Sequence, residues 1–196
     1  MIAPKLERGS TIGLCSPSSK PTPESMRRFI KGMQRMGFNV IEADNLYKDT
    51  DGYLPTIEER AADFNQMIYD DRVDLIFFSG GEGGPELLPH LDYDYLKKHP
   101  KAVLSYSDST TLLNAIWSKT GLTTYYGHTP NLFGDLRQYD WEHFVTHLME
   151  GPAEKHFANS EWHVMNPGVA QGVLVGGYSR NMAMLMNSEY FQYNPE

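Results

Sequence analysis

A cluster of small polar residues at 105–110 follows a short apolar run and precedes a segment with helical apolar spacing. This order of strand, sharp turn and helix can lift one serine out at the carboxyl edge of a sheet. Ser107 stands at its centre, with a serine two residues before it and another two residues after it. We therefore predict that Ser107 is a nucleophile. Judged by spacing alone, the more common role of a serine in such a turn is a helix cap, and that alternative stays open.

A nucleophilic serine also needs an oxyanion hole, for which the sequence offers two backbone amides. The first is that of Asp108, because the residue after an elbow nucleophile starts the helix. The second lies in the glycine-rich loop 80–84, where we predict the amide of Gly81 as donor and Gly80 as a substrate contact. A phosphate cradle is the rival interpretation, but no Gly-Lys-Ser/Thr follows and Glu82 would repel a phosphate. A flexible turn is the third.

The general base is harder to find among the seven histidines. Only His128 follows a predicted strand at the edge where a site is expected, so it is one candidate base. His143 and His147 are spaced as a helical metal pair, but a solvated helix face is the more common explanation, and no metal is predicted. Cys15 falls within a predicted buried strand and is expected in the core.

Apolar runs alternate with helical patterns along most of the chain. Such alternation predicts an α/β fold with a doubly wound, mostly parallel sheet, whose sites lie at the carboxyl ends of the strands. The expected strands are 10–15, 38–43, 73–78, 102–104 and 123–126. The loops at their carboxyl ends, where a site is expected, are 16–22, 79–84, 105–109 and 127–135.

We predict three parts along the chain. Residues 1–152 form the domain that bears the nucleophile, and 153–170 form a linker. Residues 171–196 begin a second domain, with a strand at 171–175 and a helix at 179–186. Uncovered apolar surface around 173–175 and 182–186 should promote association or disorder, and a homodimer is expected.

Composition limits the partners. The 196 residues carry a net charge of −8, which argues against nucleic acid and anionic membranes as partners. A single cysteine rules out an intramolecular disulfide, and neither a signal peptide nor a membrane-spanning stretch is recognisable. We expect a cytoplasmic protein without a cofactor.

Several motifs together resemble the LD-carboxypeptidases, which include murein tetrapeptide carboxypeptidases and microcin-immunity peptidases. The order and spacing of these motifs fit over essentially the whole chain. They are Gly-Ser-Thr-Ile-Gly-Leu at 9–14, Gly-Gly at 80–81 with Leu-Leu-Pro-His-Leu-Asp at 87–92, Tyr-Ser-Asp-Ser-Thr at 106–110, Gly-Leu at 121–122 before Tyr-Gly at 126–127, and Gly-Val-Leu-Val-Gly-Gly at 172–177.

The resemblance implies a serine peptidase with a Ser-His-Glu triad on a flavodoxin-like or class I glutamine amidotransferase-like domain. Its nucleophile falls on Ser107, and its oxyanion amides fall on Asp108 and a glycine of the 80–81 pair. Its Glu and His come from a carboxyl-terminal domain, and no residue here matches them. By this resemblance His128 is not the family base. Ser105 stands where the family has a glycine, two residues before the nucleophile.

We therefore expect a peptidase for murein-derived or related peptides that has little activity as these 196 residues. The alternatives are His128 as an in-chain base, or a catalytically dead module that binds a peptide or small ligand.

Overall fold

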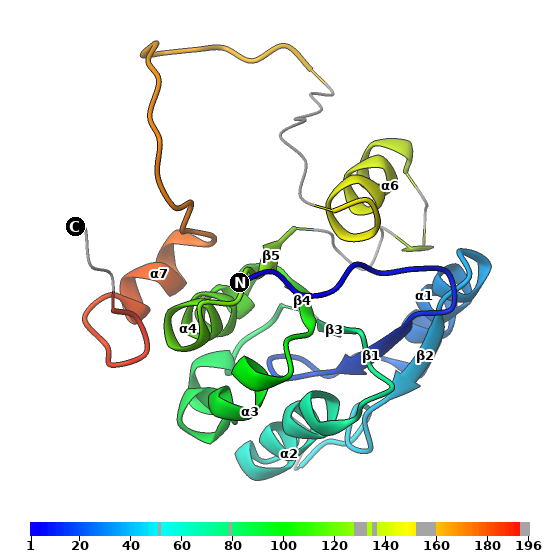
Figure 1. The fold of residues 1–196 in the computed structure, drawn as a ribbon. Helices are drawn as coiled ribbons and strands as arrows, with labels where there is room; N and C mark the ends of the chain where they lie inside the picture. The colour runs from blue at the N-terminus through cyan, green and yellow to red at the C-terminus, as the bar shows by residue number, and fades with distance from the viewer. Residues whose placement is uncertain (51, 79, 128–132, 135–136, 152–159, 193–196) are drawn as a thin grey trace.

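A five-stranded parallel sheet forms the centre of the protein (Figure 1). The computed structural model describes residues 1–196 except 51, 79, 128–132, 135–136, 152–159 and 193–196. The strands are β1 (Thr11–Cys15), β2 (Asn39–Glu42), β3 (Leu75–Phe78), β4 (Ala102–Ser105) and β5 (Tyr125–Tyr126). Their order β2-β1-β3-β4-β5 is that of doubly wound, flavodoxin-like sheets. The predicted fold class is confirmed.

The three inner strands are fully buried, which explains their nearly continuous apolar sequences. Their register places Ile12 beside Leu75 and Ile76 beside Val103, and none of these four side chains has any exposed surface. This register aligns the carboxyl ends of β1, β3 and β4 at one edge. The loops that follow these strands therefore meet there.

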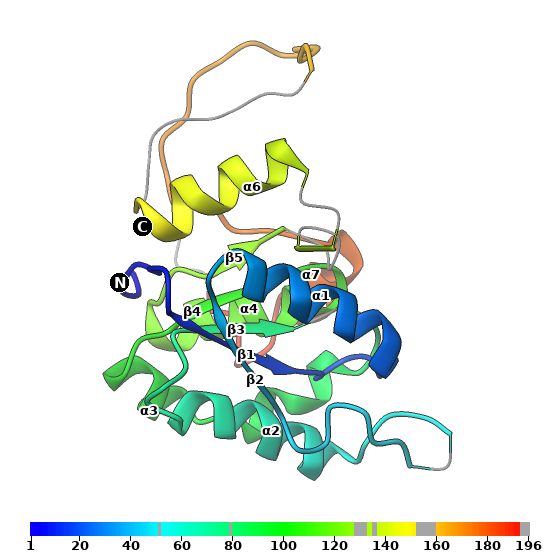
Figure 2. The same ribbon diagram turned by 90° about the vertical axis from the view of Figure 1, so that its right-hand side faces the viewer.

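Helices cover both faces of the sheet (Figure 2). α2 (Ile57–Tyr69) and α3 (Tyr93–Lys98) lie on one side, and α1 (Pro23–Arg35) and α6 (Gln138–Phe144) lie on the other. α4 (Thr110–Thr120) packs against α3 and against the 3-10 helix η1 (Gly84–His90), and a π-helical turn, η3 (Val145–Met149), continues α6. α2 begins with the capping box that its Thr56-x-x-Glu59 pattern predicts. No helix in the described part of the chain is both long and apolar enough to cross a bilayer.

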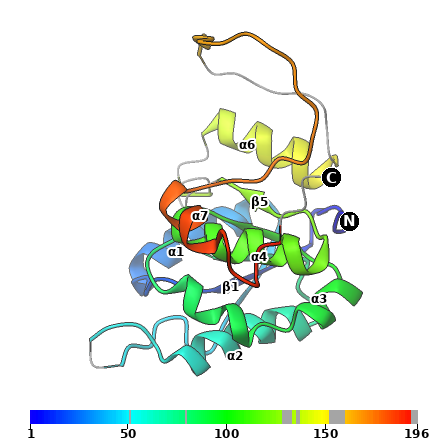
Figure 3. The same ribbon diagram turned by 90° about the vertical axis from the view of Figure 1, so that its left-hand side faces the viewer.

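The carboxyl-terminal residues differ from the prediction. The strand expected at 171–175 is absent, and residues 160–177 follow an extended path away from the sheet before α7 (Ser179–Leu185) returns to pack on α4 (Figures 1 and 3). The reason is that a strand needs a neighbouring edge, and no described strand pairs with this segment. Val173 is 66% exposed and Leu174 is 98% exposed, so the expectation of uncovered apolar surface is confirmed for these two residues.

Candidate active site

Ser107 occupies a strained backbone position between β4 and α4. Its φ is 59°, in the left-handed region. Among the described residues other than glycine, only Asn187 also has a positive φ. Such a conformation costs on the order of 1–3 kcal/mol for a residue with a Cβ, and it persists only where the surroundings impose it. The short 3-10 turn η2 (Ser107–Ser109) then leads into α4. This is the strand, sharp turn and helix that the sequence predicts.

Hydrogen bonds on three sides hold the turn in place. Ser105 Oγ donates to the carbonyl of Phe78 at 2.7 Å, which ties the end of β4 to the end of β3. Thr110 Oγ1 donates to the carbonyl of Ser107 at 2.7 Å, and the N–H of Ser107 donates to the Tyr126 hydroxyl at 3.1 Å. The Ser107 hydroxyl itself has no hydrogen-bond partner among the described residues, so it is free to meet a ligand.

The glycine loop lies directly against this turn. A Cβ on Gly80 would stand 2.6 Å from the Cβ of Ser107, and a Cβ on Gly81 would stand 1.9 Å from the carbonyl oxygen of Ser18. Only glycine permits such close approach. The N–H of Glu82 donates to the same Ser18 carbonyl at 2.7 Å, which anchors the loop to the one after β1.

The two glycine amides differ in their partners. Burial raises the pKa of the Tyr106 hydroxyl, and a hydrogen bond donated by the N–H of Gly80 offsets part of this rise. The N–H of Gly81 has no partner within the described residues. Gly81 is therefore the amide of this pair that is left without a partner in the described part of the chain, and its role as an oxyanion donor stays a prediction.

Asp108 has a role that sequence analysis missed. Its buried carboxylate accepts hydrogen bonds from the N–H of Gly84 at 2.8 Å and from the side chain of Asn181 at 2.7 Å. Asn181 also donates to the Asp108 carbonyl at 3.2 Å. One side chain thus connects the nucleophile turn, the glycine loop and α7. An acidic residue in the first turn of a helix was the only signal, and it is equally typical of an exposed helix start.

Arg60 is a second residue that sequence analysis missed. Only 4% of it is exposed, and its guanidinium donates to the carbonyls of Pro17 at 2.7 Å and of Gly83 at 3.1 Å while pairing with Glu86. Arg60 therefore holds the loop after β1 and the glycine loop together from α2. The available signal was an arginine beside Ala61 on a helix whose other buried positions are mostly apolar.

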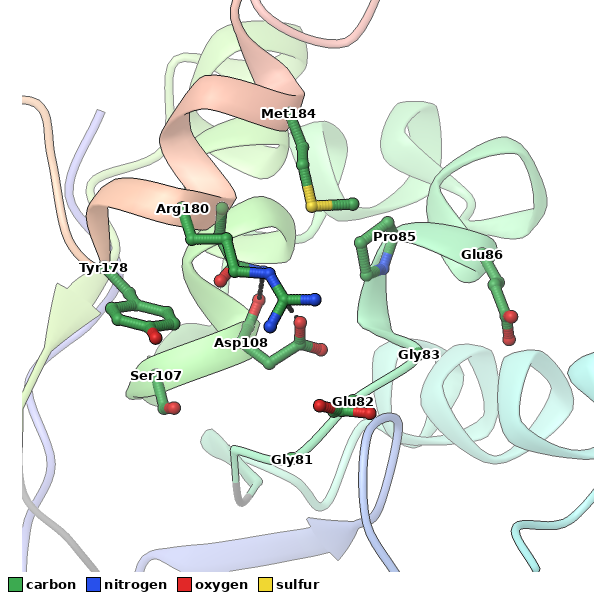
Figure 4. A pocket seen from close by; sticks show the side chains of 11 residues that line it. Gly81, Glu82, Gly83, Pro85, Glu86, Ser107, Asp108, Tyr178, Arg180 and Met184 are labelled. Carbon is green, nitrogen blue, oxygen red and sulfur yellow. Dashed lines mark hydrogen bonds between the residues drawn. The ribbon is translucent and has the colours of Figure 1, made fainter.

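These elements enclose a pocket of about 410 Å³, which we call the site pocket (Figure 4). Its lining residues come from the glycine loop, the nucleophile turn, η1 and α7, and they are Gly81, Glu82, Gly83, Pro85, Glu86, Ser107, Asp108, Tyr178, Arg180, Asn181 and Met184. The fold therefore brings Ser107, Asp108 and Gly81 together, as predicted. Gly80 lies just behind Ser107 and does not line the pocket.

No histidine lines the site pocket in the part of the chain that the structure describes. The rings of His143 and His147 stack with their centroids 5.6 Å apart, and both side chains line a different pocket beside Tyr126. His128, the candidate in-chain base, lies outside the described residues. Among the residues described, no group of histidine, cysteine and carboxylate side chains could hold a metal ion.

Comparison with known proteins assigns the chain to a family. A profile described as the LD-carboxypeptidase N-terminal domain matches residues 12–127, more than half of the sequence. The chain belongs to the LD-carboxypeptidase family. Among curated relatives, the microcin C7 self-immunity protein MccF of Escherichia coli is 41% identical over 132 residues. The "Putative carboxypeptidase YocD" of Bacillus subtilis is 31% identical over 218 residues.

The coverage of these relatives is unequal. The match spans 65% of this chain but 38% of MccF, and 97% of this chain but 67% of YocD. The chain thus corresponds to between about a third and two thirds of these family members.

Solved structures of this family share the fold. The structure of MccF without ligand superposes with a TM-score of 0.83 at 29% identity, covering 98% of this chain and 68% of that one. The structure of an MccF-like protein from Bacillus anthracis superposes with a TM-score of 0.71 at 32% identity, covering 76% of this chain and 47% of that one. MccF has also been solved in complex with aspartyl sulfamoyl adenosine, with a TM-score of 0.81 at 30% identity over 98% of this chain and 68% of that one.

Proposed function

We propose that residues 1–196 carry the nucleophile and the oxyanion hole of a serine carboxypeptidase of the LD-carboxypeptidase type. The complete enzyme hydrolyses the terminal bond of murein-derived or related peptides. The observation that carries the proposal is the left-handed Ser107, whose free hydroxyl faces a pocket that is also lined by Gly81 and Asp108. Membership of the family, with relatives named as carboxypeptidases, supports the reaction class.

In this reaction the Ser107 hydroxyl attacks the carbonyl carbon of the terminal peptide bond while a base takes its proton. The negative charge that develops on the carbonyl oxygen is held by the N–H groups of Gly81 and Asp108. The base then gives its proton to the departing amine, and the peptide bond breaks. Water adds to the resulting ester, releases the shortened peptide and returns the proton to Ser107.

We further propose that the base lies outside the described residues. Two observations support this: no described histidine lines the site pocket, and the match leaves about a third of YocD uncovered. The 196 residues alone should then hydrolyse an L,D-tetrapeptide very slowly, because a serine without its base is a weak nucleophile. Turnover by these residues at a rate typical of a complete triad would contradict the proposal. A loss of that turnover in His128→Ala would then assign the base to His128.

The direct test joins residues 1–196 to the part of YocD that the match leaves uncovered. This chimera should release the terminal D-alanine of an L,D-tetrapeptide, and Ser107→Ala should lower kcat by at least about a thousandfold. Ser25→Ala, the same change at an exposed serine in the first turn of α1, should stay within a few-fold of the unmodified chimera. A folded chimera whose activity is indifferent to Ser107→Ala would refute the assignment of the nucleophile.

A further inference from the structure

Two charged side chains of the site pocket form no ion pair among the described residues. They are Arg180, in the first turn of α7, and Glu82, in the glycine loop. The remaining carboxylates of the pocket are already satisfied. Glu86 pairs with Arg60, and the Asp108 carboxylate is held by an amide N–H and an asparagine side chain. Among the described residues, the charged groups whose polar atoms are left for a ligand are therefore Arg180 and Glu82. The Asp108 carboxylate keeps its negative charge, but its oxygens are already hydrogen-bonded.

These two charges stand on different walls (Figure 4). Arg180 extends from α7 over the pocket, and Glu82 stands on the opposite side, on the loop that carries Gly81. Ser107 lies at one end of the space between them. The segment that supplies Arg180 is fixed to the nucleophile turn, because the N–H of Tyr178 donates to Thr110 Oγ1 at 2.8 Å and Asn181 binds Asp108. Arg180 is thus placed relative to the reacting hydroxyl.

The chemistry of a terminal peptide bond requires an anion near this hydroxyl. In such a substrate only the amide nitrogen and one α-carbon separate the reacting carbonyl from the free carboxylate. An arginine guanidinium matches a carboxylate with two parallel hydrogen bonds, and Arg180 is the only basic side chain that lines the pocket in the described part of the chain. Glu82 would repel any further carboxylate, since like charges at close range are unfavourable.

We propose that Arg180 binds the free carboxylate at the end of the peptide and that Glu82 excludes a second carboxylate from the same end. The pocket then selects peptides whose last residue has a neutral side chain over peptides that end in an acidic residue. This inference rests on the proposed function, because it places the reacting carbonyl at Ser107.

Binding measurements on residues 1–196 carrying Ser107→Ala test the anchor without turnover. The probes are acetyl-L-Ala-L-Ala-D-Ala, its carboxamide, and the same peptide ending in D-Glu, titrated by calorimetry. The free acid should bind at least about tenfold more tightly than the carboxamide, and Arg180→Gln should abolish this difference. Arg180→Lys should restore part of it. Arg35→Gln, an equal change of charge on an exposed helix end, should leave the difference unchanged.

The second half of the inference has its own variant. Glu82→Gln should raise the affinity for the D-Glu peptide several-fold and change the affinity for the D-Ala peptide much less. Glu24→Gln, on the exposed start of α1, should change neither affinity. Equal gains for both peptides in Glu82→Gln would overturn the exclusion.

The outcomes separate this inference from the proposed function. Equal binding of acid and carboxamide, equal behaviour of Arg180→Gln and Arg35→Gln, or no binding of any peptide would each overturn the anchor. The YocD chimera is assayed in parallel. An active chimera whose KM for the D-Ala peptide is indifferent to Arg180→Gln defeats the anchor and leaves the function standing. A folded but inactive chimera, together with Arg180-dependent binding of the acid, defeats the function and leaves the anchor standing.

Discussion

The nucleophile turn and the carboxyl-terminal segment meet at the same pocket but are held there in different ways. The turn follows β4, a fully buried inner strand, and hydrogen bonds that involve Phe78, Thr110 and Tyr126 fix it. The segment at 160–192 lies largely at the surface and reaches the pocket through the short helix α7, where Asn181 is buried against Asp108.

This difference assigns different tasks to the two regions. The groups proposed to perform the chemistry, Ser107 and the amides, are placed by the sheet and its glycine loop. The group proposed to choose the substrate, Arg180, arrives on a mostly exposed segment that is docked by the polar contacts of Tyr178 and Asn181 and by the apolar packing of Leu185. Because most of this segment is exposed, we expect it to open locally at a lower free energy than the buried sheet. Four substitutions can break or sharpen this contrast.

Arg60→Met should have the largest effect. It removes a buried guanidinium that joins two loops beneath the nucleophile turn, and we expect a loss of about 3 kcal/mol in the free energy of unfolding. This estimate is at the low end for a buried pair, because the partner Glu86 is 52% exposed and can be hydrated. Urea denaturation measures the loss. Arg72→Met is the control: its side chain is 74% exposed beside Asp70, so it should cost less than about 0.5 kcal/mol. Equal losses in the two variants would remove the structural role assigned to Arg60.

Gly81→Ala should destabilise the same region by about 2 kcal/mol. The added methyl would overlap the backbone carbonyl of Ser18, which cannot move without displacing the loop after β1. Gly172→Ala adds the same methyl where no atom lies within 4 Å and should change the stability by less than about 0.5 kcal/mol. A fully stable Gly81→Ala would mean that the loop is not held as tightly as described.

Asn181→Ala tests the other region. It should release α7 with a local cost of about 1–2 kcal/mol, because Asp108 loses a buried partner. Hydrogen exchange should accelerate in α7 and much less in β1 and β3. Cys15 offers a second readout, since burial in β1 raises the pKa of its thiol and labelling then requires the sheet to open. Met186→Ala, at a 54% exposed position just past α7, is the control. Labelling of Cys15 that accelerates as strongly as exchange in α7 would show that the two regions unfold together.

Leu174→Ser should have the smallest effect. This side chain is 98% exposed, so its replacement should change the unfolding free energy by less than about 0.5 kcal/mol. Thermal unfolding measures this variant beside Leu104→Ser, which places a hydroxyl in the fully buried β4 and should lower the unfolding temperature far more. A marked loss in Leu174→Ser would indicate a contact that a single chain does not contain, such as the predicted homodimer.

Sequence patterns predicted the sheet and the position of Ser107 because both depend on local signals. Buried parallel strands require uninterrupted apolar runs, and a tight turn requires small residues on either side of the serine. The short β5 differs from the strand expected at 123–126, since its length depends on the neighbouring strand rather than on local pattern.

The polar network of the site could not be predicted in this way. Arg60 reaches carbonyls of two loops that are remote in sequence, and Asn181 meets Asp108 across 73 residues. No periodicity or spacing connects such partners, because three-dimensional packing alone brings them together. The unformed strand at 171–175 has the same origin, since its sequence favours a strand but pairing depends on a neighbour.

The left-handed backbone at Ser107 has a consequence for variation among related sequences. Glycine adopts this conformation without strain, and asparagine tolerates it better than serine does. A lineage that no longer used this hydroxyl would gain stability by replacing the serine with glycine or asparagine. Ser107→Gly should accordingly unfold at a higher temperature than Ser107→Ala. Glycine or asparagine at this position in a homologue would then indicate a protein that keeps the fold but no longer uses this serine in catalysis.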